Sequence, residues 1–349
     1  MKNLKLLQTI CKTPGAPGFE QRIRELVIDE VTPLVDEVEI DNMGNVMAIK
    51  RGQSDKRAMV AAHMDEIGFV VTHIDDEGFI RFKPLGGFDP KTLTAQRVIV
   101  HGKKDLIGAM GTKPIHIMTP EERKKIVQLD DYVIDLGLKK KEVEKYVTIG
   151  NPITRERECI EMGDCINSKS LDNRISVFIL IETLRALKNK KVPYDIYGGF
   201  TVQEEVGLRG AISSAHHVNP DFGFGLDVTI AYDMPPAQPH EMITKLGEGT
   251  AIKVLDGSTI CDFRMVQYMK DTANKYKIKW QTEVLPMGGT DTAGIQRYGK
   301  SGSIAGAISI PLRNMHQTIE MAHKEDVDDS IKLLTKCLLD LDKHDWSFK

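Results

Sequence analysis

The segment that most constrains the fold is Tyr197-Gly-Gly-Phe-Thr-Val-Gln-Glu204-Glu205-Val-Gly207. It begins as a run of β-forming residues and ends in two adjacent carboxylates before a glycine, which predicts a strand with Glu204 and Glu205 at its end. Neighbouring side chains on an extended strand point to opposite faces. We therefore expect the two carboxylates to have different roles, unless the backbone turns between them. A solvent-exposed glutamate pair would have the same local sequence, so other parts of the chain are needed to distinguish the two cases.

Helix and strand patterns alternate on both sides of this segment. Helices are predicted at residues 1–12, 20–31, 171–187, 210–217, 262–276 and 327–341, and strands at 36–40, 46–50, 57–62, 194–202, 222–226, 251–255, 278–284 and 304–310. Several of the strands are short continuous apolar runs, which is typical of strands buried on both faces. The pattern predicts an α/β domain built on a largely parallel sheet.

Residues 67–162 have a different character. Short β-runs recur at 69–73, 79–82, 98–101 and 107–110, a polar helical patch lies at 120–125, and no helix is long enough for a β-α-β crossover. We therefore predict a small all-β insertion, a barrel or a sandwich, at 67–162. The α/β domain would then consist of residues 1–66 and 163–349.

Composition excludes several classes of function. The chain has 349 residues, 41% of them hydrophobic, and a formal net charge of -3 with both signs mixed throughout. No basic stripe indicates nucleic-acid binding, no apolar run is long enough to span a membrane, and the first ten residues are typical of an amphipathic helix rather than a secretory signal. The five cysteines are odd in number and contain no C-x-x-C pair, which favours buried thiols in a reducing compartment. We expect a cytoplasmic protein.

Polar residues follow several of the predicted buried strands. His63 and Asp65, Glu204 and Glu205, Asp227, and His316 all occupy such positions, and Asp172 opens a long helix that could face the same edge. Ligands bind beyond the carboxyl ends of the strands in open α/β sheets. Imidazole and carboxylate ligands without thiolates suit Zn²⁺, Co²⁺ or Mn²⁺. Two such ions sharing a bridging carboxylate would acidify a water molecule between them.

Each residue also has a simpler explanation. A histidine after a strand is often a hydrogen-bonded structural residue, Asp172 could be a helix N-cap, and Asp227 could cap a turn. Taken together, polar residues at five such positions on one edge of one sheet favour a metal site.

Five segments carry a resemblance to a known family. They are, in chain order, Ala62-His63-Met-Asp65-Glu66-Ile-Gly68, Ser170-Leu-Asp172-Asn-Arg174, Gln203-Glu204-Glu205-Val-Gly207-Leu-Arg-Gly210, Gly225-Leu-Asp227-Val228 and Gly288-Gly289-Thr290-Asp291. Together they resemble the M42 (glutamyl/deblocking) aminopeptidases, the tetrahedral-aminopeptidase group. The likeness runs nearly from end to end and includes the inserted domain. It implies a three-layer α/β/α fold of the zinc-peptidase type with an inserted barrel-like dimerisation domain.

The resemblance also implies a role for each matched residue. His63, Asp172 and Asp227 would bind one metal ion, and Asp172, Glu205 and His316 the other, with Asp172 bridging. Glu204 would be the general base, and Asp65 would orient the His63 imidazole.

The implied function is a binuclear aminopeptidase that releases N-terminal residues from peptides with two divalent ions per subunit, Zn²⁺ or Co²⁺. A homo-oligomer is also implied, typically a tetrahedral dodecamer built from dimers. A related di-zinc carboxypeptidase or N-acyl-amino-acid deacylase is the nearest alternative, ahead of a glycosidase or a binding protein with a vestigial site. The preferred N-terminal residue stays open, with the loop at 232–241 as a candidate pocket wall.

The last ligand lies in a segment that departs from the family pattern. Members often have Arg-Tyr-Ile-His followed by Ser or Thr, whereas this chain has Leu312-Arg313-Asn314-Met315-His316-Gln317. His316 is preferred to His323 as the ligand, because His323 lies in a helix-start context with no predicted strand before it. Six of the other seven histidines are interpreted as structural or surface residues: His73, His101, His116, His216, His217 and His240.

Overall fold

Strand β12 (Asp195–Thr201) lies inside an eight-stranded sheet in the computed structural model, which describes residues 1–348. The strand order is β1 (Glu37–Ile40), β2 (Val46–Lys50), β12, β3 (Arg57–His63), β13 (Phe222–Ile230), β16 (Ile304–Leu312), β14 (Thr250–Leu255) and β15 (Trp280–Val284). The four central strands β12, β3, β13 and β16 are mutually parallel, and β2 and β14 flank them in the antiparallel direction. The carboxyl ends of the four parallel strands therefore meet at one edge.

Helices cover both faces of this sheet, which confirms the predicted α/β/α fold. One face packs against α1 (Leu4–Lys12), α2 (Gln21–Val31), α4 (Leu171–Leu187), α6 (Phe263–Lys275) and α8 (Lys324–Asp340), and the other against α5 (Arg209–Val218) and α7 (Thr292–Tyr298). The alternation of side chains along β3 explains why both faces are covered. Ala58 and Val60 join the larger core cluster, and Met59 joins the smaller one on the opposite face. A strand buried on both faces needs apolar residues at every position.

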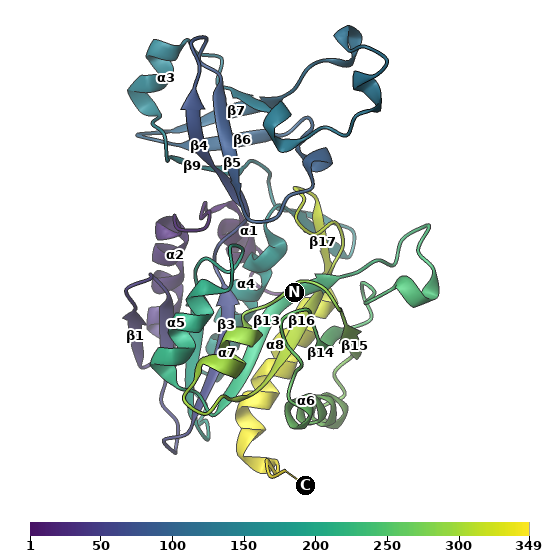
Figure 1. The fold of residues 1–349 in the computed structure, drawn as a ribbon. Coiled ribbons are helices and arrows are strands. Elements are labelled where there is room, and N and C mark those ends of the chain that lie inside the picture. The colour runs from purple at the N-terminus through teal and green to yellow at the C-terminus, as the bar shows by residue number, and fades with distance from the viewer. Residues whose placement is uncertain (349) are drawn as a thin grey trace.

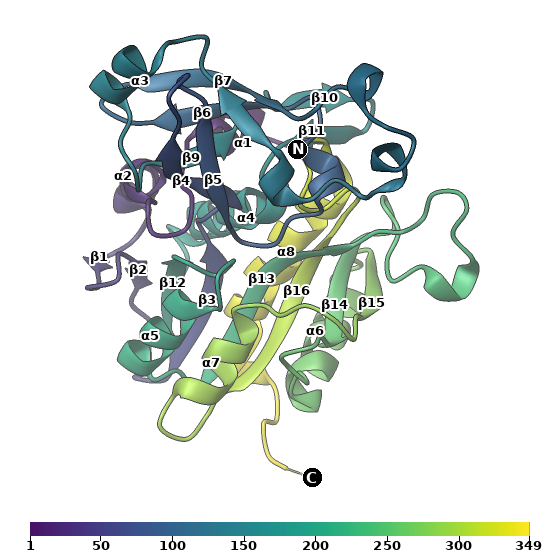
Figure 2. The ribbon, with the colours of Figure 1, turned by 45° about the horizontal axis from the view of Figure 1, so that its top comes forward.

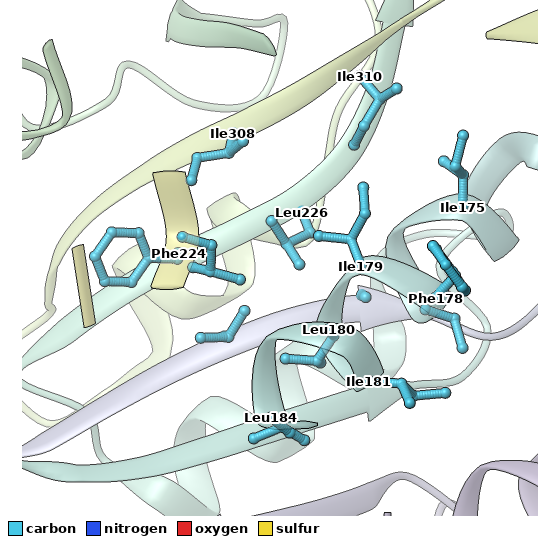
Figure 3. Close-up of a cluster of buried hydrophobic side chains, with 14 of the residues drawn as sticks. Ile175, Phe178, Ile179, Leu180, Ile181, Leu184, Phe224, Leu226, Ile308 and Ile310 are labelled. Carbon is cyan, nitrogen blue, oxygen red and sulfur yellow. The ribbon is translucent and has the colours of Figure 1, made fainter. Parts of the chain in front are cut away.

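The long helix α4 fixes the position of Asp172. Figure 3 shows Ile175, Phe178 and Ile179 of this helix beside Leu226 of β13 and the isoleucines of β16. Each fully buried side chain of this size stabilises the fold by about 1.5–3 kcal/mol. The helix is thereby anchored along the sheet, with its first residues at the edge where the parallel strands end.

The inserted β-structure is a closed antiparallel barrel, as predicted. Its strands follow the order β4 (Gly68–Ile74), β5 (Ile80–Leu85), β8 (Val133–Asp135), β7 (Asp105–Gly111), β6 (Arg97–His101) and β9 (Pro152–Arg155). The barrel has a core of its own, which includes Phe69, Val98 and Ile134. It lies at the upper end of the sheet in Figure 1, and Figure 2 shows the same arrangement from a second direction. Only four residues separate His63, at the end of β3, from the first barrel strand.

Several short elements were not predicted. Strands β8 and β9 have three and four residues, and α3 (Lys140–Tyr146) and α7 have seven each, so their periodicity is too short to recognise. A separate sheet joins β10 (Ile160–Met162) and β11 (Cys165–Ser168) to β17 (Glu320–His323). The predicted polar helix at 120–125 is a single 3₁₀ turn, Glu122–Lys124.

Three local predictions were wrong. Strand β12 ends at Thr201, and the left-handed backbone of Gln203 (φ 56°) turns the chain before Glu204, so the two glutamates do not lie on a strand. Asp172 was predicted in the first turn of a helix, but its backbone angles (φ −76°, ψ 105°) and those of Asn173 are not helical, so the regular helix begins after them. Asp227 lies inside β13 rather than after it.

All five cysteines are free thiols. Over residues 1–348, no helix has the length and apolar character that a membrane crossing requires.

Candidate metal centre

The edge of the sheet brings together all seven residues that were predicted to form a site. His63 ends β3, Asp65 follows it, Glu204 and Glu205 lie in the turn after β12, Asp227 is in β13, His316 follows β16, and Asp172 precedes the regular part of α4. Except for Asp65, which is fully buried behind His63, these side chains line one cavity of about 360 Å³. This volume is within the usual range for a small-molecule site.

The side chains form two groups with the spacing of metal ligands. In the first, the Nε2 atom of His63 is 3.4 Å from Asp172 Oδ1 and 3.8 Å from Asp227 Oδ1. In the second, the Nε2 atom of His316 is 3.3 Å from Asp172 Oδ2 and 3.6 Å from Glu205 Oε2. The potential ligand atoms of each group all lie within 4.8 Å of one another, and residues 1–348 contain no further group of this kind. Asp172 belongs to both groups and presents a different oxygen to each.

The electrostatics of the cavity favour a bound cation. Burial, together with the neighbouring charge of Asp172, raises the pKa of Glu205 to about 8. Burial also raises the pKa of Asp227. For His316 burial would lower the pKa, but hydrogen bonding to Asp172 and the charge of Glu205 outweigh it and raise the pKa to about 10. The carboxylates therefore repel one another unless positive charge lies between them.

The donor set fits divalent metal ions. Two imidazoles and three carboxylates supply the nitrogen and oxygen ligands that such ions prefer. The Oε1 atom of Glu205 is buried without a hydrogen-bond partner, which is costly for a carboxylate oxygen unless a cation approaches it.

Glu204 belongs to neither ligand group. Its Oε2 atom is 3.7 Å from the Nε2 atom of His63, and its side chain lines the same cavity. Burial raises its pKa well above the usual range, and the charge of His63 only partly opposes this increase. A buried carboxyl beside the ligand groups, with a raised pKa, has the properties of a general base or acid.

Asp65 connects the first group to the turn that carries the two glutamates. Its backbone oxygen is 3.2 Å and its Oδ1 atom 3.4 Å from the Nδ1 atom of His63. Its carboxylate also accepts hydrogen bonds from the backbone N–H groups of Glu204 and Glu205, both at 3.1 Å. One buried side chain therefore fixes the imidazole and the turn together. The bonds to the turn were not predicted.

The second group is positioned by residues that the sequence did not indicate. The Nδ1 atom of His316 lies 2.9 Å from the carbonyl oxygen of Gly87, and Arg155 donates a hydrogen bond to the carbonyl oxygen of His316, also at 2.9 Å. Gly87 follows β5 and Arg155 ends β9, so both come from the barrel. Glu320, which is fully buried, accepts a hydrogen bond of 3.0 Å from the backbone N–H of Asp172.

The segment around His316 has an unusual backbone. Asn314 and His316 both have left-handed conformations, with φ angles of 57° and 63°, and asparagine tolerates this region well. Arg313 forms a bidentate ion pair with Asp233, at 2.5 and 2.8 Å. The loop at 232–241, predicted as a pocket wall, does not line the cavity, and its Asp233 instead contacts this segment through Arg313.

His323 belongs to neither ligand group. Contrary to the prediction, it belongs to a strand, as the last residue of β17, and its side chain caps α8 by accepting a hydrogen bond from the backbone N–H of Glu325.

Comparison with known proteins gives similarities over almost the whole chain. A family model described as M42 glutamyl aminopeptidase matches residues 44–333. The lysyl aminopeptidase of Pyrococcus furiosus is 33% identical over 355 residues, covering 99% of this chain and 100% of that protein.

Two solved structures share the fold at similar identity. A TET aminopeptidase from a marine sediment archaeon of the Thaumarchaeota has a TM-score of 0.94 at 35% identity, covering 97% of this chain and 96% of its own. The TET1 peptidase of Pyrococcus horikoshii, described as able to assemble into a tetrahedron or a large octahedral shell, has a TM-score of 0.87 at 32% identity, with coverages of 96% and 99%.

Proposed function

The chain belongs to the M42 aminopeptidase family and is an aminopeptidase, and we propose that it works with two divalent metal ions and with Glu204 as the general base. The observation that carries this proposal is the sharing of Asp172 between the two ligand groups, one oxygen to each, with Glu204 beside them. In this assignment His63 and Asp227 complete the first ion's ligands, and Glu205 and His316 complete the second's. When bound, such a pair of ions polarises the scissile carbonyl and acidifies the attacking water.

Glu204 would move the protons of the reaction. Its carboxylate accepts a proton from the water that attacks the scissile carbonyl, and it then gives this proton to the nitrogen of the departing amine when the C–N bond breaks. The raised pKa suits both steps, because a carboxyl with an ordinary pKa would release the proton too readily to deliver it to the amine. Asp65 would keep Glu204 in place through the backbone of the turn.

Replacing Glu204 by glutamine tests this role. We expect Glu204→Gln to lower kcat by about 10²–10⁴-fold while two ions per chain stay bound, because the ligand groups are unchanged. Metal content by mass spectrometry and steady-state kinetics would be measured together, with the exposed Glu121→Gln as the matched control. Near-normal turnover in Glu204→Gln would refute the base assignment, and loss of an ion would make Glu204 a ligand instead.

The class of peptidase can be tested with paired substrates. An aminopeptidase needs a free α-amino group, so aminoacyl-p-nitroanilides should be cleaved and their N-acetylated forms should not. Release of acetate from the acetylated forms, with their anilide bond left intact, would favour the N-acyl-amino-acid deacylase alternative. Running the assay on metal-depleted protein reconstituted with Zn²⁺ or Co²⁺ would show which ion supports the reaction, and both suit the observed donor set.

We also propose that the barrel, within the inserted segment 67–162, mediates formation of a homo-oligomer. The TET1 peptidase of Pyrococcus horikoshii, which has the same fold, can assemble into a tetrahedron or a large octahedral shell. In the present chain Ile107, Ile115, Ile117, Ile126 and Ile149 are each at least 60% exposed, and all lie in this segment. Isolated exposed isoleucines are common, but this number in one small domain favours an interface. Light scattering after size-exclusion chromatography would give the mass, and a monomer at assay concentration would exclude the assembly.

A further inference from the structure

The cavity has a second set of walls besides the ligand groups and Glu204. Five apolar side chains contribute to it: Leu208, Val228, Leu285, Met287 and Met315. Three polar side chains, Lys253, Asp256 and Thr290, line the same space. The charge that these polar groups can offer bears on which side chain the cavity can hold.

Lys253 is charged but already paired. Its Nζ atom lies 3.1 Å from Asp256 Oδ2 and 3.0 Å from Glu283 Oε1, and all three side chains are buried. Burial would lower the lysine pKa, but the two carboxylates hold it above its ordinary value. The ammonium group therefore remains positive and is neutralised within the protein.

Asp256 has no free position for a substrate cation. Its Oδ1 atom accepts three hydrogen bonds of 2.8 Å, from the backbone N–H groups of Ser258 and Thr259 and from the Ser258 hydroxyl. Its Oδ2 atom accepts from Lys253 and, at 3.0 Å, from the Thr290 hydroxyl. A carboxylate offers about four lone-pair sites, so five donors saturate it.

We propose that the enzyme prefers peptides whose first residue has an uncharged apolar side chain, such as leucine or methionine. This inference rests on the proposed function and identifies its substrate class. An acidic side chain would have to displace a buried carboxylate from Lys253, and a basic one would have to displace a donor from Asp256. Either exchange leaves a buried charge without its partner, which is more costly than the contact that replaces it. An apolar side chain only has to cover the apolar walls.

A panel of aminoacyl-p-nitroanilides tests the inference on the metal-reconstituted wild-type protein. We expect kcat/KM for the leucine and methionine substrates to exceed that for the lysine and glutamate substrates by at least about tenfold. A higher or equal value for lysine or glutamate would overturn the inference. Failure to cleave any of the four, with two ions bound, would instead overturn the proposed function, so the two failures are distinguishable.

The Asp256→Asn variant tests whether the pairing of Lys253 is responsible for the preference for apolar side chains. The substitution removes one of the two charges that neutralise Lys253, so the ratio of glutamate to leucine cleavage should rise by about threefold to tenfold. The exposed Asp55→Asn is the matched control and should leave the ratio unchanged. An unchanged ratio in a folded Asp256→Asn protein would contradict the role given to the Lys253 pair, and the wild-type panel stands whether or not this variant folds.

Discussion

The two halves of the proposed metal centre differ in how the fold supports them. His63 and Asp227 lie on the neighbouring strands β3 and β13, and both side chains are almost completely buried. Glu205 and His316 lie in loops, the His316 side chain is 34% exposed, and this histidine depends on Gly87 and the barrel for its orientation. The first half takes its histidine and one carboxylate from neighbouring strands of one sheet, with Asp65 orienting the histidine, whereas the second forms only if two separately packed units meet correctly. The second half should therefore bind its metal ion more weakly and be easier to perturb.

Replacing the residue that both halves share should have the largest effect. Asp172→Asn keeps the shape of the side chain but replaces one carboxylate oxygen by an amide nitrogen, which cannot bind a cation. We expect both ions to bind more weakly and kcat/KM to fall by about 10⁴-fold or more, because the attacking water is then not activated. Metal titration calorimetry and kinetics would measure this. Two ions bound at wild-type affinity would show that Asp172 does not bridge the halves.

Removing one histidine at a time should separate the halves. His63→Ala and His316→Ala should each retain about one ion per chain. Without metal, the two substitutions should lower the unfolding free energy by different amounts. Loss of the buried His63 leaves a cavity and should cost about 2–4 kcal/mol, whereas loss of the partly exposed His316 should cost about 1 kcal/mol or less. Urea unfolding and metal analysis would compare them. Equal destabilisation by the two substitutions would contradict the inference that the fold supports the two halves differently.

The first half could be predicted from the sequence because strand ends are local signals. The apolar run of β3 stops at His63, and the parallel neighbour β12 stops opposite it, with Thr201 paired to His63. Asp227 was predicted at the right edge but at the wrong place in its strand. Strand β13 continues for three residues past Asp227 and is buried through Thr229, so the polar Asp227 does not mark its end.

The second half could be only partly predicted. Glu205 and His316 were predicted as site residues because each follows a predicted strand, but the residues that position them were not predicted. Arg155 and Gly87 both contact His316, but they lie 161 and 229 residues away from it in the sequence. No local pattern indicates contacts at such separations. The turn after β12 was also missed, since the left-handed backbone of Gln203 has no glycine to signal it. The different directions of Glu204 and Glu205 therefore come from a turn, and not from strand alternation.

Arg155 offers a way to weaken the second half alone. Arg155→Met keeps the aliphatic part of the side chain but removes the hydrogen bond to the His316 carbonyl oxygen. We expect the affinity for one ion to fall by about tenfold, the usual lower range for a residue that orients a metal ligand, while the other ion binds as before. Calorimetric titration would resolve the two. Arg157→Met, an exposed arginine two residues away, is the matched control, and a loss of both affinities would contradict independent support.

The smallest expected effect is the pH dependence of stabilisation by metal. Without metal the pKa of His316 is raised to about 10, so its proton stabilises the folded protein below pH 6.5, and this contribution is lost as the pH rises toward 10. Metal requires the unprotonated imidazole, so its binding strengthens over the same range.

The increase in unfolding free energy on adding metal should therefore grow from pH 6.5 to pH 9. Release of one proton from His316 can contribute at most about 1.4 kcal/mol per pH unit, and solvent screening of this partly exposed side chain should keep the contribution smaller. Thermal unfolding with and without Zn²⁺ would measure it, and the growth should be smaller in His316→Ala. If metal stabilises wild-type and His316→Ala protein with the same dependence on pH, the proton is released from the buried first half instead.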